Sequence, residues 1–167
     1  MKAFTISEIR NFMSQLLLKD TFDHLNLLEL TLTTNITYTI DGALHPDFYD
    51  AGEAELLKAR EVSHVRWSEV RPFCFSLIKG KHTPLYFKIV FQLDKEDTRR
   101  LLTEHNLSLR REDIFGLYLN CQFDGTSLTC VTGTSLRFFT MDKSVDYAWD
   151  DKVTRFFQSK NITCEST

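Results

Sequence analysis

The sequence predicts an α+β protein with a mostly antiparallel, curved sheet and about four helices. Three observations predict this fold class. Apolar residues alternate with polar ones over 28–40 and 85–93, which is typical of half-buried strands. Apolar residues recur at helical spacing over 9–17, 70–78 and 145–157. Asp-Gly pairs follow two alternating segments, and such pairs are strong signals for tight antiparallel turns.

Length and composition favour a single domain over 1–167. The chain has 167 residues, of which 43% are hydrophobic and 26% are charged, as in soluble globular domains. No run is apolar enough to cross a membrane, and the first residues lack the apolar stretch of an export signal. We therefore expect a cytoplasmic protein with no membrane partner, whose four cysteines are reduced thiols.

Capping residues predict where the helices begin. A Ser, Thr, Asp or Asn side chain at this position accepts a hydrogen bond from a backbone N–H of the first turn. The segment Thr5-Ile6-Ser7-Glu8 also matches the capping-box pattern. The predicted N-caps are Thr5 or Ser7, Ser68, Asp94 and Ser144. A short, acidic helix is also predicted over 51–60.

The alternating segment from Leu28 to Ile40 fits two structures. A continuous strand keeps one phase throughout. A hairpin that turns at 33–35 keeps the same phase and would pair Leu32 with Ile36. Periodicity does not choose between the two.

A second hairpin is predicted around Asp124-Gly125, between strands at 114–123 and 126–132. A two-residue turn there would place Cys121 opposite Leu128. The two cysteines of this hairpin would then share a face of the sheet diagonally, without direct pairing.

An internal repeat with an offset of about 83 residues is a further hypothesis. Ile36–Gly42 and Leu119–Gly125 are both alternating segments that end in Asp-Gly. The pseudo-repeats would span 1–80 and 84–162, in a layout similar to the saddle fold of the TATA-binding protein. Chance explains the same matches, because alternating strands that end in Asp-Gly are common.

The net charge of −3 argues against binding of nucleic acid through a basic surface. The charge is locally uneven, because residues 66–88 contain five basic side chains and only one acidic one. The basic residues are Arg66, Arg71, Lys79, Lys81 and Lys88. If they form one patch, nucleic acid is an alternative partner.

The segment 78–84 is the strongest candidate for a binding site. A helix is predicted to end at Gly80, where several cationic side chains gather and would hold a phosphate or carboxylate. The candidate anion-binding residues are Lys79, Lys81 and His82, with Arg71 assisting. The plainer interpretation is that lysines near a helix C-terminus favour the helix dipole and are otherwise solvated.

The sequence contains no catalytic signature. Its five histidines are scattered and match neither a metalloprotease motif nor a nucleophile triad. Four acidic residues surround the start of the last helix, where the dipole favours them: Asp142, Asp146, Asp150 and Asp151. We therefore predict no catalytic, metal-binding or cofactor-binding residue, and an enzyme is not favoured.

Three segments resemble an uncharacterised family of small proteins from anaerobic Firmicutes, which is catalogued as a domain of unknown function. These segments are Ile78–Pro84, the strand Leu85–Leu93, and Thr140–Ser144 with Trp149-Asp150. The resemblance spans nearly the whole chain. It implies a bacterial cytosolic protein with no established activity and with no catalytic residues to carry over.

Two functional hypotheses follow. The first is a non-catalytic binding or assembly module, for which a protein partner or self-association is favoured over nucleic acid. The second is a small enzyme or sensor that binds an anionic metabolite, either phosphorylated or a carboxylate, at the 78–84 segment.

Overall fold

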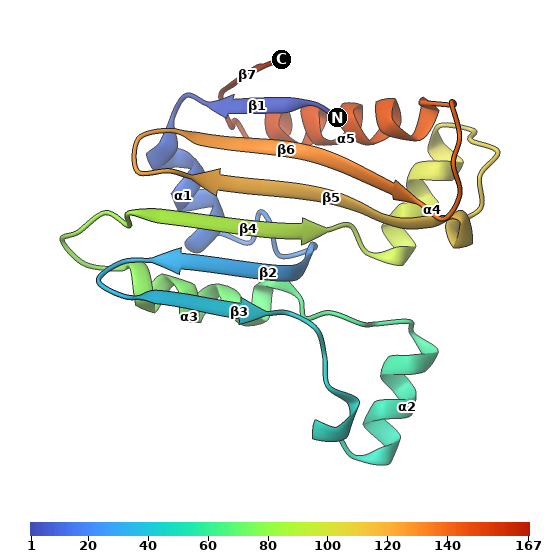
Figure 1. Cartoon of the computed structure of the whole chain (residues 1–167), viewed down its shortest axis with the longest axis horizontal. Coiled ribbons are helices and arrows are strands. Elements are labelled where there is room, and N and C mark those ends of the chain that lie inside the picture. Colours follow the sequence, from blue (N-terminus) through green and yellow to red (C-terminus); the bar gives the residue numbers. More distant parts are fainter.

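One antiparallel sheet of seven strands forms the centre of the computed structural model, which describes all 167 residues. The strand order is β3-β2-β4-β5-β6-β1-β7 (Figure 1). The strands are β1 (Ala3–Ile6), β2 (Asn26–Thr33), β3 (Thr37–Asp41), β4 (Tyr86–Gln92), β5 (Ile114–Phe123), β6 (Leu128–Leu136) and β7 (Cys164–Ser166). Each strand is antiparallel to its neighbours.

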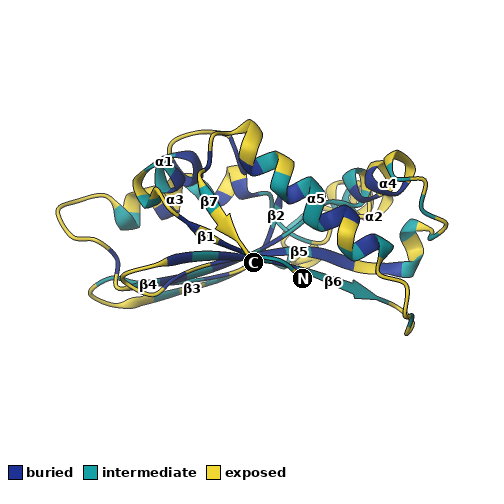
Figure 2. Cartoon of the chain, turned by 90° about the horizontal axis from the view of Figure 1, so that it is seen from above, coloured by how far each residue is buried: buried dark blue, intermediate teal, exposed yellow.

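Five helices lie on one side of this sheet, and the opposite face is open (Figure 2). They are α1 (Ile9–Leu17), α2 (Ala51–Ala59), α3 (Trp67–Ile78), α4 (Lys95–Glu104) and α5 (Ser144–Ser159). Two short 3-10 helices, η1 (Pro46–Phe48) and η2 (Arg111–Asp113), complete the structure. The predicted α+β class with an antiparallel sheet is confirmed.

Alternation along the strands divides the sheet into an apolar covered face and a polar open face. In the central strand β4, Phe87, Ile89 and Phe91 are buried in the core. Lys88, on the open face, forms an ion pair with Glu29 of β2 at 3.1 Å. The alternation of apolar and polar residues along the strands therefore indicates which face of the sheet the helices cover.

Two buried tryptophans join helices to their neighbours. Trp67, at the start of α3, donates its indole N–H to the carbonyl oxygen of Leu16 in α1 at 2.9 Å. Trp149 of α5 donates to the carbonyl oxygen of Tyr118 in β5 at 2.8 Å. A buried indole N–H needs an acceptor, so these bonds select one position for each helix.

The alternating segment at 28–40 forms a hairpin, and the alternative of a continuous strand is wrong. Residues 34–36 turn the chain, and Leu32 pairs with Tyr38 rather than with Ile36. The backbone N–H of Thr34 donates to the carbonyl oxygen of Ile36 at 2.9 Å, so the turn begins one residue later than predicted. Ile36 is consequently exposed.

The two-residue turn predicted between β5 and β6 is wrong. The Asp124 side chain accepts hydrogen bonds from the backbone N–H groups of Thr126 and Ser127 at 2.9 and 2.8 Å. This longer turn shifts the register by two residues. Cys121 pairs directly with Cys130, and their Sγ atoms lie 3.3 Å apart.

Of the predicted helix caps, only Asp94 is correct, and it accepts a hydrogen bond from the backbone N–H of Asp97 at 2.7 Å. The N-caps of the other three helices are Glu8, Arg66 and Lys143, none of which caps through its side chain. At α1 the N-cap lies later in the chain than the predicted Thr5 or Ser7, because β1 extends to Ile6.

Residues 42–65 form an arm that projects from the β3 side of the sheet and carries η1 and α2 (Figure 1). No residue of α2 is buried. At the base of the arm, the backbone N–H of Leu44 donates to the carbonyl oxygen of Ser63 at 2.9 Å. A Cβ atom at Gly42 would lie 1.9 Å from the carbonyl oxygen of Leu27, so only glycine fits there.

The sheet does not show the predicted repeat. Each half of the chain runs strand, helix, two strands, helix, and the arm is inserted into the first half. However, β4 pairs with β5 of its own half, whereas its counterpart β1 pairs with β6 and β7. The segments 1–80 and 84–162 therefore share an order of elements, and the duplication stays a prediction.

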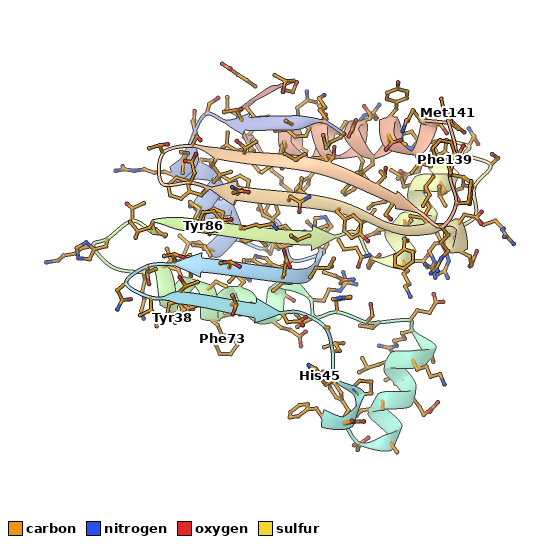
Figure 3. All side chains as sticks on the ribbon, viewed as in Figure 1. Tyr38, His45, Phe73, Tyr86, Phe139 and Met141 are labelled. Carbon is orange, nitrogen blue, oxygen red and sulfur yellow. The ribbon has the colours of Figure 1, made fainter.

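Several large apolar side chains lie exposed outside the sheet (Figure 3). Phe139 and Met141 belong to the loop between β6 and α5, and Phe73 projects from α3. Leu85, the first apolar residue of the alternating segment 85–93, precedes β4 and is 65% exposed.

The packing predicts that the four thiols differ in reactivity. Cys74, Cys121 and Cys130 are buried, and burial raises the pKa of Cys74 to about 12. Cys164 is only partly buried. Because the thiolate is the reactive form, Ellman's reagent should label Cys164 alone in the native protein and all four thiols in denaturant. Rapid labelling of the other three without denaturant would contradict this packing.

Candidate functional site

A cleft of about 730 Å³ opens between the arm, the start of α4 and the ends of several strands. Residues from β2, β4 and β5 line it, together with the segment that links α2 to α3. We call it the arginine cleft because its lining includes Arg60, Arg66, Arg99, Arg111 and Arg137.

The arginine cleft is cationic, although the chain as a whole carries a net charge of −3. Its five arginines and Lys95 face only three acidic side chains. These are Glu61, Asp94 and Glu96. Positive charge gathered in a concave site raises the local concentration of anions.

Arg111 is the least satisfied group in the cleft. Its side chain is only 10% exposed. The guanidinium forms hydrogen bonds only through Nη2, to the two carboxylate oxygens of Glu61 at 3.3 and 3.4 Å. Its Nε is buried and has no partner. A buried donor without a partner costs about 1–3 kcal/mol, so this group calls for an acceptor from outside the chain, such as water or a ligand.

Glu61 lies between Arg111 and Arg99, whose Nη2 is 3.2 Å from Oε2 of the carboxylate. It follows the C-cap of α2 with a φ of 55°, a left-handed conformation in which glycine is usual. The arm therefore brings a carboxylate to two arginines from α4 and η2. The two guanidinium groups thus already donate hydrogen bonds to a carboxylate of the chain itself.

The other basic groups of the cleft differ in their pairing. Arg66 Nη2 lies 2.7 Å from Asp94 Oδ2, and Arg99 Nη1 lies 3.0 Å from Glu96 Oε2. Asp94 also caps α4, so Arg66 is attached to the start of that helix. Three cations of the cleft form no ion pair: Arg60, Lys95 and Arg137.

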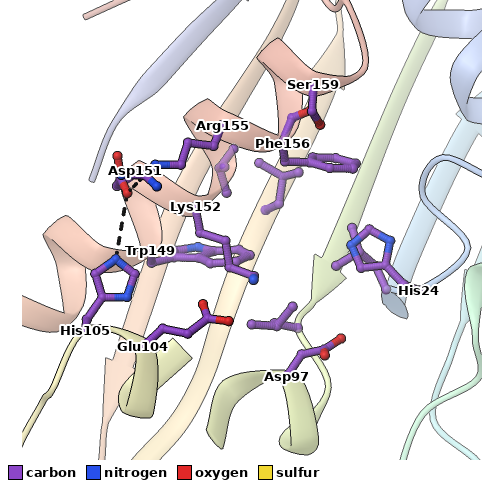
Figure 4. A pocket seen from close by; sticks show the side chains of 14 residues that line it. His24, Asp97, Glu104, His105, Trp149, Asp151, Lys152, Arg155, Phe156 and Ser159 are labelled. Carbon is purple, nitrogen blue, oxygen red and sulfur yellow. Dashed lines mark hydrogen bonds and ion pairs between the residues drawn. The ribbon is translucent and has the colours of Figure 1, made fainter. Parts of the chain in front are cut away.

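A second pocket, of about 520 Å³, lies between α4 and α5 (Figure 4). Apolar side chains including Trp149 and Phe156 line it beside charged groups. His105 Nε2 is 3.7 Å from Asp151 Oδ2, and Arg155 Nε is 2.9 Å from the same oxygen. Three carboxylates, of Asp97, Glu104 and Asp151, line this pocket against only Lys152 and Arg155, so it lacks the cationic excess of the arginine cleft.

The structure brings together three of the four residues predicted to bind an anion. Lys79, Lys81 and His82 line a separate groove of about 390 Å³, beside residues of α1. Arg71 does not line this groove. Its Nε and Nη2 instead donate to the two carboxylate oxygens of Asp23, each at 2.9 Å. Arg71 thus lies apart from the other three, and an anion site at 78–84 stays a prediction.

The basic stretch 66–88 does not form a single patch. Three of its five basic side chains are paired with acids from different parts of the chain. The pairs are Arg66–Asp94, Arg71–Asp23 and Lys88–Glu29. Most of the positive charge on which the nucleic-acid alternative depends is therefore compensated locally.

Two of the acidic residues in the first half of α5 anchor that helix to the sheet. Asp150 accepts a hydrogen bond from the hydroxyl of Thr132, and Asp146 accepts one from the hydroxyl of Thr134. Both threonines belong to β6. These carboxylates therefore have structural partners within the fold.

Sequence reasoning missed the arginine cleft because its arginines are dispersed between positions 60 and 137. No local spacing connects Arg99 on a helix with Arg111 on a 3-10 turn. The one available signal was Glu61, which stands after a predicted acidic helix at a position where glycine usually ends the helix.

The family of the chain follows from comparison with known proteins. A family model, described as a family of unknown function (DUF5721), matches residues 15–165. The chain belongs to this family. The resemblance inferred from the sequence, to an uncharacterised domain family, is confirmed, and its bacterial origin stays a prediction.

Neither a curated protein nor a solved structure matches the chain. Within the structure, no helix combines the length and the apolar character needed to cross a membrane.

We expect stability to depend on pH through His64, which lines the arginine cleft. Burial lowers the pKa of His64; Asp41 opposes this shift and Lys95 adds to it. Because the folded pKa lies below the unfolded value of about 6.5, the stabilisation is complete above that pH and is lost as pH falls.

Urea unfolding should therefore give a smaller free energy of unfolding near pH 5.5 than near pH 7.5. The variant His64→Gln removes this titrating group and should show a smaller difference between the two conditions. His24, whose pKa is also lowered by burial, contributes the same sign and remains in the variant. An equal pH dependence in both proteins would contradict the role of His64.

Proposed function

We propose that this protein is a non-catalytic binding module whose ligand is anionic and occupies the arginine cleft. The observation that carries the proposal is Arg111, a nine-tenths buried arginine whose Nε has no partner and whose other contacts go only to Glu61. Stability alone does not favour such a group, because removing a guanidinium from water is costly when its donors stay unpaired.

The cleft offers an anion three features together. It has an excess of positive charge, with three cations that lack ion-pair partners. It has planar guanidinium donors, which match the geometry of phosphate and carboxylate oxygens. Its volume of about 730 Å³ lies within the range of about 300–1,000 Å³ that is typical of small-molecule sites.

In this proposal, the Glu61 carboxylate competes with the ligand for Arg99 and Arg111. Its carboxylate bridges Arg99 and Arg111 through contacts of 3.2–3.4 Å, which are long for charge-assisted hydrogen bonds. Its side chain is 42% exposed, and it belongs to an arm whose helix buries no residue. A ligand with more negative charge than a carboxylate would therefore displace Glu61 from the two arginines.

The first test measures binding of inorganic pyrophosphate by calorimetry. The wild-type chain should bind, and Arg111→Met or Arg99→Met should each weaken binding by about tenfold or more, since a hydrogen bond to a charged group contributes about 1.5–3 kcal/mol. The exposed Arg99 provides a variant for which misfolding is not a concern.

Two controls accompany this test. Arg100→Met removes the same charge from the neighbouring position of α4, which does not line the cleft, and should bind pyrophosphate like the wild type. The double variant Lys79→Ala/Lys81→Ala should also bind normally. Loss of binding in the lysine variant, with full binding in the arginine variants, would move the site to the 78–84 segment.

The second test asks whether Glu61 competes with the ligand. Glu61→Gln removes the competing charge and should tighten pyrophosphate binding by about fivefold, which corresponds to about 1 kcal/mol. Glu55→Gln, an exposed change of equal charge on the same arm, should leave the affinity nearly unchanged. Weaker binding by Glu61→Gln would show that Glu61 organises the arginines instead of competing for them.

A further inference from the structure

The arginine cleft has an aromatic part as well as a cationic one. Phe115, at the start of β5, lines the cleft and is 60% exposed. The guanidinium carbon of Arg137 lies 4.6 Å from the centre of the Phe115 ring. Most of the surface of this ring is therefore in contact with water, and a ligand ring that covered it would gain from its burial.

Strand β5 contributes further residues to the lining of the cleft after Phe115. Gly116 and Tyr118 also line the cleft. A Cβ atom at position 116 would lie 2.3 Å from the Tyr118 ring and 2.6 Å from the side-chain nitrogen of Gln92. Tyr118 can cover the strand at this point only because residue 116 is glycine. The tyrosine ring therefore lies close to the backbone of Gly116, the residue that follows Phe115.

Planar rings bind in such surroundings by stacking. Aromatic rings attract one another in offset or edge-to-face arrangements, and a guanidinium stacks on aromatic faces in the same manner. The guanidinium of Arg137 lies over the Phe115 ring and forms no ion pair. A planar ligand ring would find both an aromatic partner and a cation at this end of the cleft.

We infer that the ligand carries a planar ring joined to its anionic group, as a free nucleoside diphosphate does. The phosphates would bind Arg99 and Arg111, and the ring would stack on Phe115 beside Arg137. This inference rests on the proposed function, because it assigns both parts of one ligand to the same cleft.

The test compares adenosine diphosphate with inorganic pyrophosphate, by calorimetry on the full chain. Adenosine diphosphate should bind about 5- to 150-fold more tightly, which corresponds to the roughly 1–3 kcal/mol of base–aromatic stacking. Phe115→Ala should remove this advantage and leave the affinity for pyrophosphate unchanged. Phe115 is exposed, so its replacement leaves the core intact.

Phe139→Ala is the matched control. Phe139 is an exposed phenylalanine of the loop after β6 that does not line the cleft, and its loss should change neither affinity. Equal affinities of the wild type for the two probes would overturn the inference and leave the proposed function standing. Failure of both probes to bind would overturn the proposed function and the inference together.

A short single-stranded RNA without terminal phosphates tests the other source of the same chemistry. It should not displace adenosine diphosphate, because the chain is acidic overall and the cations are gathered inside one cleft. Displacement by this RNA at comparable concentration would contradict a free nucleotide as the ligand.

Discussion

The structure depends on one constraint: helices cover the sheet on a single face (Figure 2). Every strand must therefore send alternate side chains into one shared core, which explains why β4 alternates buried Phe87, Ile89 and Phe91 with half-buried residues on the open face. The helices in turn need fixed positions above the sheet. Buried indole hydrogen bonds from Trp67 and Trp149 supply two of them, because an unpaired N–H in the core is costly.

The ends of β2, β4 and β5 and the start of α4 meet at the arginine cleft, and charged side chains line it. The arm adds Glu61 from outside the sheet, and α4 adds Arg99. The arginine cleft is thus assembled from segments that are independent in sequence and adjacent only through the strand order.

Two features of the arginine cleft are the basis of the proposed binding function. Arg111 is buried with an unpaired Nε, and Phe115 exposes an apolar ring to water. The unpaired Nε costs stability in the absence of a ligand, and the proposed ligand would pair this donor with anionic oxygens and cover the exposed ring with its own. The neighbouring pocket between α4 and α5 differs because its charges, such as Asp151 and Arg155, already satisfy one another.

The sequence by itself determined the fold class, because hydrophobic periodicity is a local property that records which face of each element is buried. It also determined the Asp94 cap, which needs only residues three apart. The register of the β5–β6 hairpin depends on a local contact that periodicity does not record, because the Asp124 side chain selects a longer turn and sets Cys121 opposite Cys130. Only the tertiary structure decided the site, because the approach of Glu61 to Arg111 depends on sheet order, which no local pattern encodes.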